Sequence, residues 1–149
     1  MPKSLNFDTG RVEYDINGAA TVSFNPTDTA FVERVHKLFT DLESRQDEYQ
    51  KRIEEIGEDG AAMFAYASER DQEMRGLIDG VLGEGVADAL FPDMNCYALA
   101  AGMPVWVNLM FAIAEEIDAA FGEQQKKADP RLKKYNAKFE AMRKKYRRK

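Results

Sequence analysis

Histidine and cysteine, which commonly perform nucleophilic and zinc chemistry, are scarce in this chain. His36 is the only histidine and Cys96 the only cysteine. His36 follows Val35 in an apolar repeat typical of a helix, so we expect a surface or partly buried histidine and not a catalyst. Cys96 has no basic neighbour in the sequence, which favours a buried structural thiol. One His and one Cys cannot form a zinc site of the Cys/His type within one chain. A single cysteine also allows no intrachain disulfide and indicates a reducing compartment.

The remaining polar motifs give no stronger sign of catalysis. The glycines between residues 80 and 85 lack the Gly-Lys-Ser/Thr of a phosphate-binding loop, and no Gly-x-Ser-x-Gly nucleophile elbow is present. The carboxylates follow neither the spacing of an EF-hand nor the Glu-x-x-His pairs of a di-iron bundle. We therefore predict no cofactor, no metal and no enzymatic activity. Two carboxylate groups are better explained as solvated faces than as cation sites: Glu54-Glu55 with Glu58-Asp59, and Glu115-Glu116 with Asp118.

The charges divide the chain into two parts. Residues 126–149 hold twelve Lys and Arg against Asp129 and Glu140, a net charge of +10. Residues 1–125 hold nine basic and twenty-four acidic side chains, a net charge of −15. Asymmetry of this size is typical of a separate interaction segment. We therefore expect an acidic body, 1–125, and a basic C-terminal arm, 126–149; the alternative is that the arm folds back onto its own body.

The arm has the pattern of a basic amphipathic helix that begins at Pro130. An isolated helix of this length is marginal in water, so such a segment tends to fold on a partner. A basic amphipathic helix can bind three kinds of partner: an acidic protein groove, nucleic acid or an anionic membrane. Because the body's charge of −15 would repel the last two, we expect a protein partner, with nucleic acid less favoured and a membrane not expected; self-association stays open. The predicted binding residues are an apolar stripe spaced by three and four residues and a basic cluster: Leu132, Tyr135, Phe139, Met142 and Tyr146, with Arg143, Lys144, Lys145, Arg147 and Arg148.

Residues 11–24 have the pattern of a β-hairpin. Val12, Tyr14 and Ile16 alternate with acidic residues, which is the period of a half-buried strand. Asn17-Gly18 tolerates the positive φ angles of a two-residue type I′ turn. Leu5 and Phe7 also alternate, so the sequence leaves two or three strands open.

The rest of the body reads as helices. Helical spacing predicts segments at about 26–56, 61–82, 86–91 and 104–121, with a further turn or two at 95–101 and a polar linker at 123–129. Asn25 is the expected cap of the first helix, whose second half should project as an antiparallel hairpin. The fourth is apolar nearly all round and should form the core with the first through Trp106, Leu109, Phe111 and Ile113. No apolar run reaches the ~18 residues of a membrane span, and residues 1–8 lack the apolar stretch of a secretory signal. The predicted fold class is α+β, predominantly α: an N-terminal β-hairpin packed on a helical bundle.

Three parts of the chain resemble small proteins encoded in the tail-gene clusters of siphophages and prophages of Gram-positive bacteria, most closely the small tail-assembly chaperones. The likeness covers much of the chain, but its motifs are structural and carry no catalytic signature. No compact binding motif of that group can be matched residue by residue. The resemblance rests on these segments: Phe7-Asp8-Thr9-Gly10, Asn17-Gly18 and Phe24-Asn25-Pro26-Thr27-Asp28 within Leu5–Val35; Arg70-Asp71 through Ile78-Asp79-Gly80-Val81 to Ala89-Leu90-Phe91; and the basic C-terminus.

This resemblance implies a chaperone that binds the long, aggregation-prone tape-measure protein while the tail tube polymerises around it, in the cytoplasm of the bacterial host. Two alternatives stay open. One is a phage-encoded inhibitor of a host defence complex of the CRISPR type, whose acidic face would imitate nucleic acid. The other is an accessory protein that binds nucleic acid through the basic arm.

Overall fold

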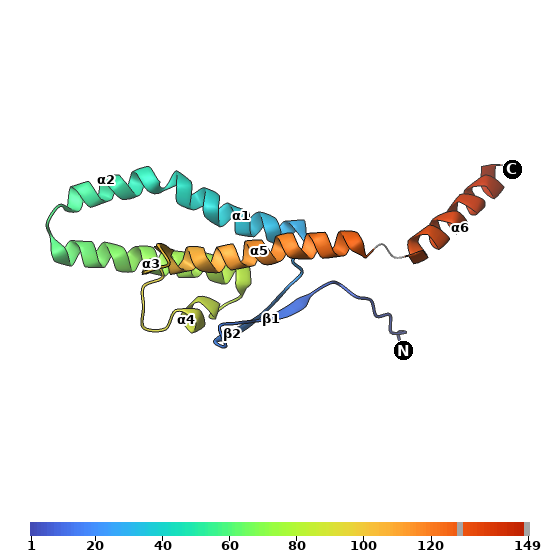
Figure 1. The fold of residues 1–149 in the computed structure, drawn as a ribbon, viewed down its shortest axis with the longest axis horizontal. Coiled ribbons are helices and arrows are strands. Elements are labelled where there is room, and N and C mark those ends of the chain that lie inside the picture. Colours follow the sequence, from blue (N-terminus) through green and yellow to red (C-terminus); the bar gives the residue numbers. More distant parts are fainter. Residues whose placement is uncertain (128–129, 148–149) are drawn as a thin grey trace.

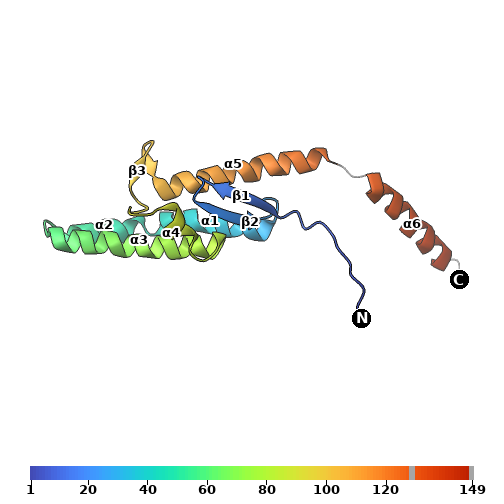
Figure 2. The same cartoon turned by 90° about the horizontal axis from the view of Figure 1, so that it is seen from below.

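The computed structural model describes residues 1–127 and 130–147. The fold is α+β and predominantly α, with an N-terminal hairpin followed by helices, as the sequence predicts. The molecule is elongated: α1 and α2 run antiparallel to α3, α5 lies alongside, and α6 extends beyond the end of α5 (Figures 1 and 2). The elements in order are β1 (Val12–Ile16), β2 (Ala20–Phe24), α1 (Thr29–Ser44), α2 (Gln46–Ile56), α3 (Gly60–Leu82), α4 (Val86–Leu90), β3 (Leu99–Ala100), β4 (Met103–Pro104), α5 (Val105–Lys126) and α6 (Pro130–Arg147).

The hairpin forms where predicted, but its loop is longer. Asn17 and Gly18 take positive φ angles of 55° and 67°, as the Asn-Gly pair predicts. However, β1 and β2 pair antiparallel with Ile16 opposite Ala20, so the loop has three residues and not two. The extra residue, Ala19, donates its N–H to the Ile16 carbonyl (3.0 Å). This bond closes the predicted turn at Asn17-Gly18, but the hairpin loop is one residue longer than predicted.

Residues 1–11 do not add the third strand that the sequence left open. Leu5 and Phe7 are 92% and 84% exposed. The end of this segment is fixed by a side chain, because the Asn25 amide donates to the Thr9 carbonyl (2.9 Å).

One face of the hairpin packs on the helices. Val22 and Phe24 are buried, and the Phe24 ring stacks between Tyr14 (centroids 4.5 Å apart) and Phe31 of α1 (4.2 Å). The Tyr14 hydroxyl also donates to the Glu116 carboxylate of α5 (3.0 Å). These contacts give the two-stranded sheet the support that such a sheet requires.

The first predicted helix, 26–56, is two helices. Asp28, and not Asn25, caps α1, since the Asp28 carboxylate accepts the Ala30 N–H (3.0 Å). Asn25 instead accepts the N–H and hydroxyl of Thr27 (2.8 Å each), which forms a turn before the helix. The break between α1 and α2 lies at Arg45, whose N–H is shared by the Asp41 and Leu42 carbonyls.

The second half of the predicted helix does project as an antiparallel hairpin. α2 returns into α3 through Gly57, which has a φ of 62°, and no residue of α2 is buried.

The turns after α3 are set by backbone and carboxylate contacts. α3 ends at Gly83, where φ is 128°, as the glycine cluster predicts. The Asp79 carboxylate accepts the N–H groups of Gly85 (3.1 Å) and Ala87 (2.9 Å) and so positions α4. The helical turn predicted at 95–101 is wrong, because this stretch forms a non-helical turn and then β3, which pairs with β4.

α5 is the central helix. Trp106, Leu109 and Ile113 are buried as predicted, but Phe111 is 47% exposed and stacks on the half-buried Phe39 (centroids 5.9 Å apart). α5 also continues through Gly122 to Lys126, beyond the predicted end at 121 and into the predicted linker. No helix among the described residues is long and apolar enough to cross a membrane.

Candidate functional site: an exposed C-terminal helix

α6 forms one continuous helix and projects from the body. Pro130 occupies its first position, where a missing N–H costs nothing. Both views place the helix beyond the C-terminal end of α5, at the opposite end of the molecule from the turn between α2 and α3 (Figures 1 and 2). Every α6 side chain that the structure describes is exposed. The arm is therefore not folded back onto its own body.

The apolar stripe of α6 has no cover from the body. Leu132, Phe139 and Met142 are 65%, 64% and 52% exposed. Their spacing of seven and three residues places them on one face of the helix. The side chains of Tyr135 and Tyr146, also predicted to contact a partner, lie outside the described residues. The three described anchors are thus brought together on one unpartnered face.

The basic cluster lies in the last turns of the same helix. Lys144 and Lys145 are exposed, and Arg143 pairs with Glu140 (3.2 Å). Such an exposed pair contributes at most about 1 kcal/mol. Arg143 could therefore leave Glu140 and pair with an acidic group of a partner. The Arg147 side chain and all of Arg148 lie outside the described residues.

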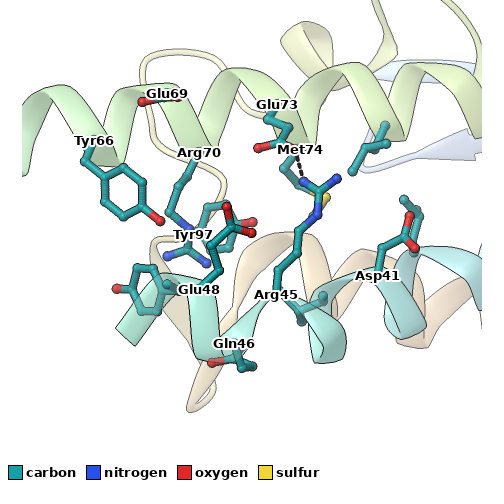
Figure 3. Close-up of a pocket in the computed structure, with 14 residues that line it drawn as sticks. Asp41, Arg45, Gln46, Glu48, Tyr66, Glu69, Arg70, Glu73, Met74 and Tyr97 are labelled. Atoms are coloured by element: carbon teal, nitrogen blue, oxygen red, sulfur yellow. Dashed lines mark ion pairs between the residues drawn. The ribbon is translucent and has the colours of Figure 1, made fainter. Parts of the chain in front are cut away.

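A second candidate, missed by the sequence analysis, is a cavity of about 290 Å³ between α1, α2, α3 and the loop at Tyr97 (Figure 3). Its charged lining comprises four carboxylates and two guanidinium groups. Arg45 forms an ion pair with Glu73 across the cavity. These charged residues are Asp41, Glu48, Glu69 and Glu73, with Arg45 and Arg70.

Three tyrosine rings and two guanidinium groups pack on one another beside this cavity. Arg70 lies between two rings, 3.6 Å from the Tyr49 centroid and 4.1 Å from the Tyr97 centroid. Tyr49 in turn stacks on Tyr66 (centroids 6.0 Å apart), and Arg52 lies 5.7 Å from the Tyr66 centroid. We call these five residues the Tyr–Arg stack. Because Arg70 lies between the rings of Tyr49 and Tyr97, the stack joins α2, α3 and the loop. Its three tyrosines and Arg70 also line a second cavity of about 260 Å³.

Neither His36 nor Cys96 lies in α6 or lines either cavity. His36 is exposed on α1, as predicted. Cys96 is buried, also as predicted, and burial, with the nearby Asp71 carboxylate, raises the pKa of its thiol to about 12. A thiol with so high a pKa stays protonated at neutral pH and is a poor nucleophile. Within the described residues, no three His, Cys, Asp or Glu side chains are grouped so as to hold a metal ion.

Cys96 belongs instead to a buried polar network that fixes the loop after α4. The Asp71 carboxylate accepts the Cys96 N–H (2.7 Å) and the Arg75 Nε–H (3.0 Å). Arg75 also donates to the Phe91 carbonyl (2.7 Å) and to Asp88 (2.9 Å). Burial would raise the pKa of Asp71, but the hydrogen bonds from Cys96 and Arg75 outweigh it and hold that pKa below its usual value.

The sequence does contain one sign of this network. Asp71 and Arg75 are four residues apart on a helix, and the neighbouring Met74 and Ile78 are buried on the core side.

Comparisons with known protein families, with curated proteins and with solved structures find no match for this chain.

Proposed function

We propose that this chain is a tail-assembly-chaperone-like protein that binds a helical protein partner, such as a tape-measure protein, through α6. It would act in the cytoplasm of the bacterial host and as a binding protein, not as an enzyme. The observation that carries the proposal is the stripe of Leu132, Phe139 and Met142, exposed on a helix that projects from the body. The resemblance of the sequence to tail-assembly chaperones supplies the choice of partner.

The stripe is suited to a helical partner because of its spacing. Anchors separated by three, four and seven residues on one helical face are the pattern by which an amphipathic helix enters an apolar groove. A long helical protein presents such grooves between the side chains of neighbouring turns. The surrounding Lys and Arg would orient the helix and speed association with an acidic surface.

The experiment is co-expression with a siphophage tape-measure protein. The full chain should co-purify with it and raise its soluble yield, whereas residues 1–125 should not. Replacing Leu132, Phe139 and Met142 with Ser should weaken binding by about 2 kcal/mol or more if these residues are hot spots.

A matched control removes apolar area elsewhere. Leu5 and Phe7 are even more exposed than the α6 anchors, so Leu5→Ser with Phe7→Ser should leave binding unchanged. Binding by residues 1–125, or an equal loss in this control, would contradict the proposal.

The same variants separate the alternatives when their binding to nucleic acid and to a host defence complex is measured. If the arm binds nucleic acid, neutralising Arg143, Lys144 and Lys145 should cost more than removing the apolar stripe, and affinity should fall steeply with salt. If the acidic face inhibits a host defence complex, binding to that complex should survive deletion of the arm.

A further inference from the structure

The two ends of the molecule carry net charges of opposite sign. The basic end is α6, with eight Lys and Arg against Glu140 within Pro130–Arg147. The opposite end is α2 with the turn that follows it, residues 46–59, which we call the acidic tip. It holds six carboxylates against Lys51 and Arg52, and all eight charged side chains are exposed. The carboxylates are Asp47, Glu48, Glu54, Glu55, Glu58 and Asp59.

The acidic tip lies beyond the reach of the arm of the same chain. α5 has 22 residues and α6 has 18, which correspond to lengths of about 33 and 27 Å at 1.5 Å per residue. Only residues 127–129 join the two helices. If α6 were laid back along α5, it would therefore end before the start of α5 at Val105. In both views the acidic tip lies beyond that start (Figures 1 and 2).

We propose that α6 of one copy docks on the acidic tip of a second copy. The net charges of the two surfaces are +7 and −4, so their attraction favours this contact over one between like ends. Apolar area is available on both sides. Phe64, close to the start of α3, is 78% exposed, and α2 buries none of its residues. The stripe of α6 would cover this area.

The contact joins different surfaces of the two copies. Because arm and tip lie at opposite ends, two copies side by side in opposite directions can exchange both arms, and copies end to end can form a chain. A helical partner of α6 would compete with this association. The inference concerns the chain alone, so its failure would leave the proposed binding of another protein untouched.

Sedimentation velocity of the purified full chain over a range of concentrations provides the test. The chain should associate at low salt, and association should weaken as ionic strength rises, because exposed charges are screened. Replacing Glu54, Glu55 and Glu58 with Lys should weaken it by roughly tenfold or more, because three exposed carboxylates that would attract the arm become cations that repel it. These changes lie near the C-terminus of α2, where cations suit the helix dipole.

Two further sets of variants make the test specific. A control with the same change of charge, Glu13→Lys with Glu115→Lys and Asp118→Lys, alters exposed carboxylates away from the tip and should associate nearly as the parent does. Replacing Arg143, Lys144 and Lys145 with Glu should abolish association. Mixing this arm variant with the tip variant should restore it, because each supplies the charge that the other has reversed.

Three results would overturn the inference. One is a full chain that stays monomeric at low salt. Another is an equal effect of the tip and control substitutions. The third is a failure of the mixed variants to associate when circular dichroism shows both to be folded.

Discussion

The two ends of the hairpin formed by α1, α2 and α3 are held together by different forces. At one end α1 buries Phe31, Val35 and Leu38 against α3, α5 and the β-hairpin. At the other end α2 buries no residue. There the Tyr–Arg stack and the pair Arg45–Glu73 connect it to α3.

This difference predicts how each end behaves. Burial of apolar area is little affected by salt, and a residue with many packed neighbours opens only when the whole domain unfolds. Cation–π and ion-pair contacts between partly exposed side chains are each worth about 1 kcal/mol. The core end should therefore set the global stability, and the acidic tip should open locally at a lower cost in free energy.

The largest expected effect is at the core end. Trp106 is fully buried, so Trp106→Ala should lower the free energy of unfolding by about 3–5 kcal/mol in denaturant titrations. Phe111→Ala, on the same helix but 47% exposed, is the control and should cost much less. Equal losses, or the fluorescence of a water-exposed Trp in the parent, would place α5 outside the core.

A smaller loss is expected from the buried network. Asp71→Ala leaves Arg75 without its buried carboxylate and should cost about 3 kcal/mol. Asp88→Ala removes the exposed partner of the same guanidinium and should cost less than about 1 kcal/mol. Similar losses in the two variants would show that burial does not decide the strength of these ion pairs.

The same carboxylate predicts a dependence on acid. The pKa of Asp71 is lowered in the folded state, so its contribution is complete above the unfolded pKa of about 3.9 and is lost as the pH falls through the folded value. In acid titrations of stability, the parent and Asp71→Ala should converge as the pH decreases. A constant difference down to the lowest pH would contradict the assignment.

The smallest effect should be confined to the acidic tip. Arg70→Ala removes the centre of the Tyr–Arg stack and should weaken the attachment of α2 by about 1–2 kcal/mol. Hydrogen exchange should show α2 amides losing protection while α1 amides do not change. Arg34 over Phe31 (5.9 Å) is a matched cation–π contact at the core end, and Arg34→Ala should leave α2 unchanged. A loss of protection spread over α1 and α2 alike would contradict the distinction between the two ends.

The sequence predicts most features that depend on local pattern. Asn17-Gly18, the glycines after α3 and the period of α6 identify a hairpin, a helix end and an exposed helix at the observed places. Features that depend on packing are predicted less well. The orientation of Phe111 could not be predicted from the sequence. A helix that is apolar nearly all round has no polar face to show which of its sides is buried.

Two helix boundaries show the same limit. The break at Arg45 has no Gly or Pro to mark it and is fixed by hydrogen bonds of the backbone. α5 continues through Gly122 although Gly costs up to about 1 kcal/mol in a helix, because Ile117 and Ala120 before it are buried. Neither the backbone hydrogen bonds at Arg45 nor the burial before Gly122 can be inferred from the residue types at these boundaries.

The candidate site was predicted in part. The stripe and basic cluster of α6 follow from spacing and charge alone, and their binding role stays a prediction. The Tyr–Arg stack joins residues from three segments between Tyr49 and Tyr97. No local sequence pattern marks any of these tyrosines and arginines as a contact of the others, so the stack could not be predicted from the sequence.

The central claim is that α6 is an interaction helix and not part of the core. Its most direct test is the unfolding of residues 1–125 compared with the full chain, followed by circular dichroism and denaturant titration. We expect one cooperative transition in both, with free energies of unfolding within about 0.5 kcal/mol, because no described side chain of α6 is buried. A truncated chain that is unfolded, or less stable by about 2 kcal/mol or more, would show that the arm belongs to the core.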